Sequence, residues 1–296
     1  MSRLRLIETT GFPDYALLDS GSGRKLERFG KFTFDRPEPQ AIWSPKLAPV
    51  TWSRADAAFK AEKTDEESEG GNWQTARPLP ATWPLQVMGV TTLCRLMSFR
   101  HLGIFPEQLP HWEWMVERIA RVGGERPRVL NLFAYTGAAS LIAAKAGAEV
   151  THVDASKKAI QWAKDNQAAS KLTEAPIRWI LDDARKFVAR EVRRAKTYHV
   201  ILVDPPKFGR GPEGEVWDLF THLAPLMRDC AALLDPKEAS LVLTVYAIRA
   251  SALAFDQLTR EVLAGRSGSY DTGELAIRAK DGNAVPTSLF TRWVGS

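Results

Sequence analysis

The chain has 296 residues, of which 45% are hydrophobic and 25% charged, and this composition excludes a disordered or low-complexity protein. Forty Lys and Arg residues against 35 Asp and Glu give a net charge of +5, which suits a polyanionic partner without requiring one. Two cysteines, Cys94 and Cys230, are too few for a disulfide framework or a four-ligand zinc site, so we expect no metal and a reducing, cytoplasmic setting. The start MSRLRLIETTGF lacks the apolar core of a signal peptide, and no apolar run is long enough to span a membrane.

Residues 1–115 read as a β-rich lobe, in which short extended pieces are interrupted by Gly and Pro. Asp14–Asp19 and Lys25–Phe29 flank the turn Ser20–Gly23 and predict a hairpin, and Phe32–Phe34 and Gln40–Trp43 are further strand candidates. Lys60–Gly71 is acidic and polar, which favours a solvated loop. This lobe could recognise a substrate, and a helix from His111 to Val122 follows it.

The segment from Arg128 to Asp154 predicts a strand, a tight turn, a helix and a second strand that ends in an acid. The apolar run Val129–Phe133 fits a buried strand, and Ala138–Ala146 is rich in strong helix formers. In such a unit the turn Ala134–Gly137 brings backbone N–H groups close to a ligand, and Asp154 can accept hydrogen bonds from ribose hydroxyls. The segment therefore predicts a nucleoside site or, equally, a plain βαβ unit with a solvated Asp154.

The spacing and the glycine content of this segment limit the choice of cofactor. Phe133 and Asp154 are 154 − 133 = 21 residues apart, close to the roughly 20 of nucleotide-binding βαβ units. Only Gly137 is present where the dinucleotide fingerprint requires three glycines, which disfavours a pyrophosphate. S-adenosylmethionine carries a ribose and an amino-acid tail but no phosphate, so it fits this site better.

Two further strands are expected to end in acids. Ile177–Leu181 leads into Asp182, Asp183 and Ala184, where an acid followed by a small residue can bind an adenine ring. Lys186, Arg190 and Arg193 share one face of the next helix and could contact phosphates, although a solvated basic face is the commoner explanation.

The apolar run His199–Val203 is expected to be a buried parallel strand, and it ends in Asp204, Pro205, Pro206, Lys207 and Phe208. Ligands bind at this edge of open α/β sheets, where Asp204 could attract a sulfonium or accept a proton. Asp-Pro-Pro is also a common way to end a strand. Glycines at 209, 211 and 214 predict a loop flexible enough to close over a substrate. Gln108 either reaches the polar end of the cofactor or faces water at a helix start.

Acid-tipped strands in this order, followed by DPPKF and a terminal hairpin, resemble class I S-adenosylmethionine-dependent methyltransferases, and the bacterial group that acts on large-subunit ribosomal RNA most of all. The resemblance implies a Rossmann-like α/β fold with a seven-stranded sheet in residues 116–296, the last strand antiparallel. It also implies that Asp154, with Ala155 and Ser156, holds the ribose, that Asp182, Asp183 and Ala184 hold the adenine, and that Asp204, Pro205, Pro206 and Phe208 are catalytic. The glycine-loop motif of the family corresponds to Asn131, Leu132, Phe133, Ala134, Tyr135, Thr136, Gly137 and Ala138.

The sequence departs from the family pattern at two places. Asn131 stands where the family often has an acid, and no cysteine stands at Pro206 or Tyr246–Ile248, where members that methylate carbon 5 of cytosine carry their nucleophile. We therefore expect transfer to a nitrogen or oxygen of an RNA base, with Asp204 orienting or deprotonating it and Phe208 stacking on it. The alternatives are a small-molecule or protein acceptor, and a non-catalytic RNA-binding module that retains the cofactor pocket. The missing glycines disfavour a nicotinamide enzyme, and the sequence does not predict an oligomeric state.

Overall fold

The computed structural model describes residues 4–61, 70–246, 248–280 and 282–296, so 62–69 of the expected acidic loop lie outside it. The chain forms two compact units. Unit 1 comprises Met1–Ile7, Leu109–Leu275 and Thr287–Ser296, and unit 2 comprises Glu8–Gln108 and Ala276–Pro286. The division expected from the sequence, between 115 and 116, falls within helix α2 (Leu109–Ile119).

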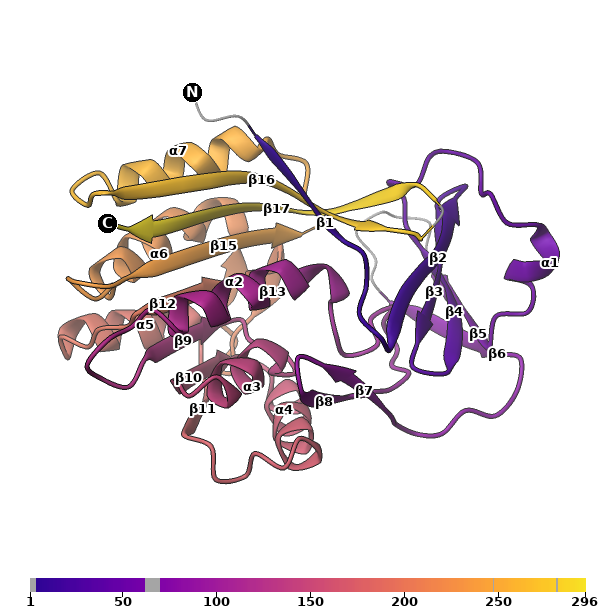
Figure 1. Ribbon diagram of the computed structural model, residues 1–296, viewed down its shortest axis with the longest axis horizontal. Helices are drawn as coiled ribbons and strands as arrows, with labels where there is room; N and C mark the ends of the chain where they lie inside the picture. Colours follow the sequence, from indigo (N-terminus) through magenta and orange to yellow (C-terminus); the bar gives the residue numbers. More distant parts are fainter. Residues whose placement is uncertain (1–3, 62–69, 247, 281) are drawn as a thin grey trace. The chain divides into compact units, whose positions relative to one another are not determined.

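Unit 1 is built on an eight-stranded sheet with the order β1-β16-β17-β15-β12-β9-β10-β11 (Figure 1). Five neighbouring strands are parallel: β9 (Arg128–Leu132), β10 (Glu149–Asp154), β11 (Ile177–Leu181), β12 (Val200–Val203) and β15 (Ser240–Tyr246). The last strand, β17 (Ala284–Gly295), pairs antiparallel with β15. The Rossmann-like fold is confirmed, with one strand beyond the expected seven because β1 (Arg5–Thr9) joins β16 (Gly268–Arg278) at the edge.

Helices cover both faces of this sheet. Figure 1 shows α5 (Ala184–Arg193), α6 (Leu219–Ala232) and α7 (Ala252–Val262) on one face, and α2, α3 (Ala138–Lys145) and α4 (Lys157–Ala169) on the other. Because both faces are covered, β12 is apolar throughout, and β15 is buried from Ser240 to Val245 instead of alternating between buried and exposed positions. A hydrophobic core lies under α5, α6 and α7, and its fully buried members include Leu130, Phe187, Ile201, Met227 and Leu241. Among the described residues, no helix is long and apolar enough to cross a bilayer.

Unit 2 contains the β-rich part of the chain. Its five-stranded sheet has the order β2 (Tyr15–Gly21), β3 (Arg24–Phe29), β4 (Phe32–Pro37), β5 (Ala57–Ala61) and β6 (Gly71–Thr75), and β7 (Trp83–Val87) pairs with β8 (Val90–Cys94). The remaining elements are the short helix α1 (Pro49–Trp52) and a 3-10 turn, η1 (Pro106–Gln108). Trp83 is buried and stacks on Phe34 with 5.3 Å between ring centroids, so this tryptophan belongs to the core.

One expectation about local structure is wrong. Gln40–Trp43 is not a strand, because its carbonyls instead accept hydrogen bonds from the β2–β3 turn: Ser22 N–H donates to Trp43 O and Gly23 N–H to Ala41 O. The flexibility expected for the glycine-rich loop after Phe208 stays a prediction. The ends of this loop pair as an antiparallel hairpin of β13 (Phe208–Arg210) and β14 (Val216–Asp218).

Candidate active site

The carboxyl ends of β9, β10, β11 and β12 bring most of the predicted site residues to one edge of the sheet. The four strands are parallel neighbours. The residues that follow them therefore lie side by side at that edge, as in other open α/β sheets. Backbone bonds tie these strand ends together, since Asp182 N–H donates to Asp154 O and Ala134 N–H donates to Val153 O, both at 3.1 Å.

The loop after β9 has an unusual backbone. Phe133, Tyr135 and Gly137 all have positive φ, at 55°, 48° and 81°. Side chains other than glycine rarely adopt this conformation, and such strain is found mostly at functional sites. The loop therefore has three residues with positive φ but only one glycine, and the sequence did not indicate that Phe133 and Tyr135 would be the other two.

Asp154 at the tip of β10 is held by the loops on either side of it. Its Oδ2 accepts from Tyr135 N–H and its Oδ1 from Ser156 N–H, both at 2.8 Å. Burial raises the pKa of Asp154, and these two hydrogen bonds oppose that effect. Each oxygen keeps a lone pair for a further donor. Ser156 also caps α4 by accepting from Ala159 N–H at 3.2 Å.

A buried polar layer supports this loop from below. Asn131 donates from Nδ2 to Ser140 Oγ at 3.0 Å, and Ser140 Oγ lies 3.0 Å from His152 Nδ1. Burial lowers the pKa of His152 to about 3, so the imidazole is neutral. Asn166, also fully buried, donates to Thr136 O at 2.9 Å. Asn131 thus has its amide committed to α3, and its expected contact with the cofactor stays a prediction.

Asp183 is the N-cap of α5. Its Oδ1 accepts from Arg185 N–H at 2.9 Å and from Lys186 N–H at 3.1 Å, and Ala184 is the buried first residue of the helix. Asp182 pairs with Arg190. Of the three residues predicted on the basic face of this helix, Lys186 and Arg190 form ion pairs with acids of this chain. At these two positions the face is therefore neither free to bind phosphates nor simply solvated.

The hairpin β13–β14 follows the carboxyl end of β12. Trp217 on β14 is buried, donates from Nε1 to Pro206 O at 2.7 Å, and packs on Phe133 with 4.9 Å between ring centroids. It therefore connects the loop after β9 with the Asp204–Phe208 segment, a role that nothing in the sequence indicated. Phe208 is 56% exposed, and Lys207 Nζ lies 5.1 Å from the centre of its ring. Pro205 is buried and Asp204 is half-buried.

Ion pairs hold this hairpin on α5. Lys186 Nζ contacts Glu213 Oε2 at 3.0 Å and also pairs with Glu215. Arg185 donates from Nη2 to Val216 O at 3.1 Å. The helix capped by Asp183 thus also positions the segment that follows Asp204.

Three predicted or considered residues lie elsewhere. Gln108 is a buried residue of η1 in unit 2, and its contact with a cofactor stays a prediction. Cys94 and Cys230 are both fully buried, and burial raises the pKa of Cys94 to about 12 and that of Cys230 still further. A nucleophilic cysteine must reach its thiolate and its substrate, so neither thiol suits that role.

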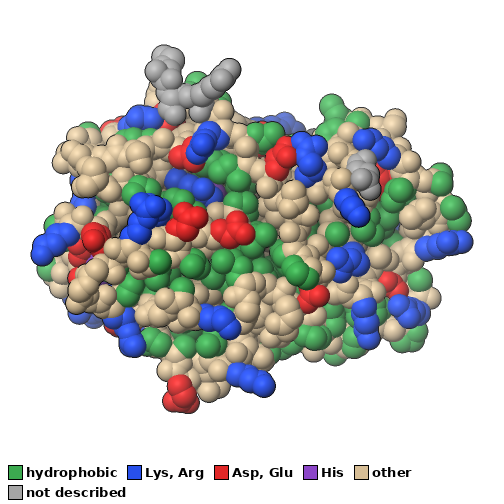
Figure 2. Space-filling view, viewed as in Figure 1, with side chains coloured by type: hydrophobic (Ala, Val, Ile, Leu, Met, Phe, Trp, Pro, Cys, Tyr) green, Lys and Arg blue, Asp and Glu red, His purple; other side chains and the backbone are tan. Residues whose placement is uncertain are grey.

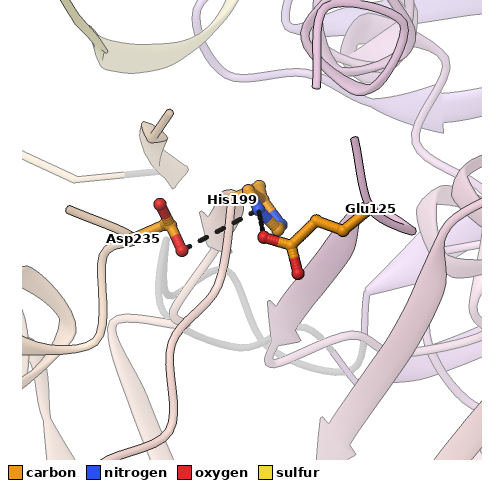
Figure 3. A group of neighbouring side chains, drawn as sticks. All are labelled: Glu125, His199 and Asp235. Carbon is orange, nitrogen blue, oxygen red and sulfur yellow. Dashed lines mark hydrogen bonds and ion pairs between the residues drawn. The ribbon is translucent and has the colours of Figure 1, made fainter. Parts of the chain in front are cut away.

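One group of described residues has the composition of a metal site. Figure 3 shows Glu125, His199 and Asp235, whose ligand atoms lie within 4.8 Å of one another. His199 Nδ1 accepts from Arg128 N–H at 3.0 Å, so its proton is on Nε2, 3.2 Å from Glu125. The Arg128 guanidinium pairs with Glu125 and Asp235. The group is thus internally satisfied and lies where β9 and β12 begin, away from the carboxyl edge.

The comparisons with known proteins agree with this geometry. A family model described as "Conserved hypothetical protein 95" matches residues 112–224. The crystal structure of an S-adenosylmethionine-dependent methyltransferase from Agrobacterium tumefaciens is 49% identical, covers 99% of this chain and 94% of its own, and has a TM-score of 0.94. The chain belongs to the S-adenosylmethionine-dependent methyltransferases.

This methyltransferase also resembles two curated ribosomal RNA enzymes. It is 30% identical over 220 residues to ribosomal RNA large subunit methyltransferase I of Citrobacter koseri, which covers 69% of this chain and 54% of the relative. It is 38% identical over 110 residues to ribosomal RNA large subunit methyltransferase K/L of Shewanella frigidimarina, or 36% of this chain and 15% of the relative. The methyltransferase thus spans about half the length of the first relative and less of the second.

The site residues fit S-adenosylmethionine. Asp154 has lone pairs left for ribose hydroxyls, and the strained loop 133–137 brings its backbone close to the same strand edge. This edge lacks the multiple glycines that a pyrophosphate needs. The cofactor expected from the sequence therefore agrees with both the geometry and the family.

Proposed function

We propose that this methyltransferase transfers a methyl group to a base of RNA, and specifically of large-subunit ribosomal RNA, in the cytoplasm. The names of the two curated relatives support the substrate. The observation that carries the proposal is the end of β12, where the exposed ring of Phe208 follows Asp204 and two prolines. An exposed aromatic ring beside a carboxylate suits an unpaired base, which can stack on the ring while the acid contacts its edge.

Bound S-adenosylmethionine supplies an electrophilic methyl group on a positively charged sulfur. We propose that Asp154, with Ala155 and Ser156, holds the ribose, that Asp182, Asp183 and Ala184 border the adenine, and that Phe133, Ala134, Tyr135, Thr136 and Gly137 contact the cofactor mainly through their backbone. Gln108 and Asn131 complete the proposed set. Alignment of two reactants by such a site can contribute roughly 7–11 kcal/mol to lowering the barrier.

The chemistry proposed for the acceptor needs no covalent intermediate. Asp204 orients the attacking nitrogen or oxygen of the base, or accepts its proton, while Pro205 and Pro206 fix the strand end and Phe208 stacks on the base. Both thiols are buried with raised pKa values, which supports a mechanism without a cysteine nucleophile.

The experiment is methyl transfer from labelled S-adenosylmethionine to large-subunit RNA transcribed in vitro, which carries no modification. We expect transfer by the wild type, loss of at least about 100-fold in kcat for Asp204→Asn, and a raised KM for RNA in Phe208→Ala. The matched control is Phe220→Ala, which also removes an exposed ring (61% exposed), at the start of α6. Absence of transfer to any ribosomal RNA would refute the substrate. Loss of transfer in folded Cys94→Ala/Cys230→Ala protein would refute the mechanism without a thiol.

A further inference from the structure

Arg292 on β17 is a buried arginine without an acidic partner among the described residues. It is 8% exposed, and it donates from Nε to His111 Nδ1 at 3.0 Å and from Nη2 to Pro110 O at 2.8 Å. Its guanidinium carbon lies 5.4 Å from the ring centre of Trp114 and 5.3 Å from that of Phe290. Every group that it contacts is therefore neutral, because His111 must be unprotonated on Nδ1 to accept this bond.

Neighbouring charges do not neutralise this arginine. Burial lowers the pKa of Arg292 to about 10, with Asp271 and Glu117 raising it and Arg5 and Arg118 lowering it, so it stays charged at neutral pH. Both acids already have a partner: Asp271 pairs with Arg5 at 3.0 Å, and Glu117 lies 3.5 Å from Arg118. The charged groups that influence one another here are thus three arginines and two acids, which leaves one positive charge in excess.

One donor of this arginine is available to a ligand. Nη1 of Arg292 has no hydrogen-bond partner within the part of the chain that the structure describes. Nε of Arg118 has no partner there either, but it is buried, so Arg118 contributes charge at this place and not a donor that a ligand can reach. Figure 2 shows Lys and Arg side chains interspersed with Asp and Glu on the face of the molecule that it draws. A buried charge is costly without a counter-ion, and a planar guanidinium fits an oxyanion well.

We propose that Arg292, together with Arg118 and Arg5, binds a phosphate oxyanion on this face of the sheet. Nη1 of Arg292 donates to it directly, and the other two arginines supply charge at its rim. The anion is either free phosphate or a phosphate of the RNA backbone, since both present the same oxygen atoms. The site differs from the active site, because Arg292 pairs in mid-strand with Val242 of β15 and contacts none of the residues assigned to the cofactor.

The test is calorimetric titration of the full chain with inorganic phosphate, at constant ionic strength maintained with chloride. We expect saturable binding in the millimolar range, at least about tenfold weaker in Arg292→Met. Because Arg292→Met could unfold, Arg118→Gln is the second variant and should weaken binding several-fold. The matched control is Arg228→Gln, a half-exposed arginine of α6 paired with Glu261. No saturable binding by the wild type, or equal weakening by Arg228→Gln, would overturn the proposal.

A second arm separates the two sources of phosphate. If the ligand is RNA, Arg118→Gln weakens binding of a large-subunit RNA fragment and reduces its salt slope by about one, with the affinity for S-adenosylmethionine unchanged. If the ligand is free phosphate, RNA binding is unchanged while phosphate binding is lost. The phosphate titration requires no RNA, so its outcome does not depend on the proposed substrate.

Discussion

His152 should make this protein sensitive to mild acid. The side chain is fully buried beneath the loop 133–137, and burial lowers its pKa from 6.5 to about 3. In the unfolded chain the imidazole takes up a proton as the pH falls below its usual pKa of about 6.5, whereas in the folded chain it does not. Between these two pKa values the unfolded state binds more protons, so the free energy of unfolding falls as the pH falls.

The magnitude follows from the difference between the two pKa values. Each pH unit in this window costs roughly 1.4 kcal/mol, so His152 alone lowers the free energy of unfolding by about 2 kcal/mol at pH 5 relative to neutral pH. His111, whose pKa burial also lowers well below its usual range, adds a loss of the same sign. Two kcal/mol is a sizeable part of the stability of a typical domain.

The assay is urea unfolding at pH 7, 6 and 5 for the wild type and His152→Asn, which keeps a polar group near Ser140. The variant should be less stable at pH 7 but should lose about 2 kcal/mol less between pH 7 and pH 5. His222→Asn, which removes a half-buried imidazole of α6 instead of a fully buried one, is the matched control. The reasoning fails if the wild type and His152→Asn show the same pH dependence.

Three further outcomes follow from the site. Gly137→Ala should lower the free energy of unfolding by about 1–3 kcal/mol more than Gly147→Ala. Both glycines have positive φ, but of the two only a Cβ at Gly137 would meet a neighbour, 3.0 Å from Ala163 Cβ. Equal losses in urea unfolding would contradict this reasoning. Asp154→Ala should weaken the binding of S-adenosylmethionine, measured by calorimetry, by about 10–100-fold, because it removes charged hydrogen bonds to the ribose. An unchanged affinity would exclude Asp154 from the site. Lys186→Met should speed amide hydrogen exchange across residues 208–218 without lowering global stability, because it removes the ion pairs through which two glutamates hold the hairpin to α5. A hairpin as well protected as in the wild type would show that these ion pairs are dispensable.

The sequence predicted the parts of the fold that depend on local patterns. Strands β9 to β12 are short apolar runs, and an acid stands at or directly after the end of β10, β11 and β12. It did not predict the pairings that arise only in three dimensions. Trp217 lies 84 residues after Phe133 (217 − 133) in the printed chain, and nothing near either residue indicates their contact.

The basic helix shows why side-chain roles were harder to predict than elements. Lys186 and Arg190 share a helical face, and a sequence reading treats that face as exposed. Their acidic partners come from the far hairpin and from the end of β11, so the interpretation changes once the chain is folded. Charge patterns identified the helix correctly but not its partners.

The loop 133–137 also explains why a missing glycine fingerprint is weak evidence about function. Phe133 and Tyr135 adopt positive φ because tertiary contacts hold them: Phe133 packs on Trp217, and Tyr135 N–H donates to Asp154. Strain of about 1–2 kcal/mol per residue persists only where the surrounding structure compensates for it. The acid at the strand tip is one of those compensating groups. The same carboxylate can therefore shape the loop and, as we propose, bind the ribose.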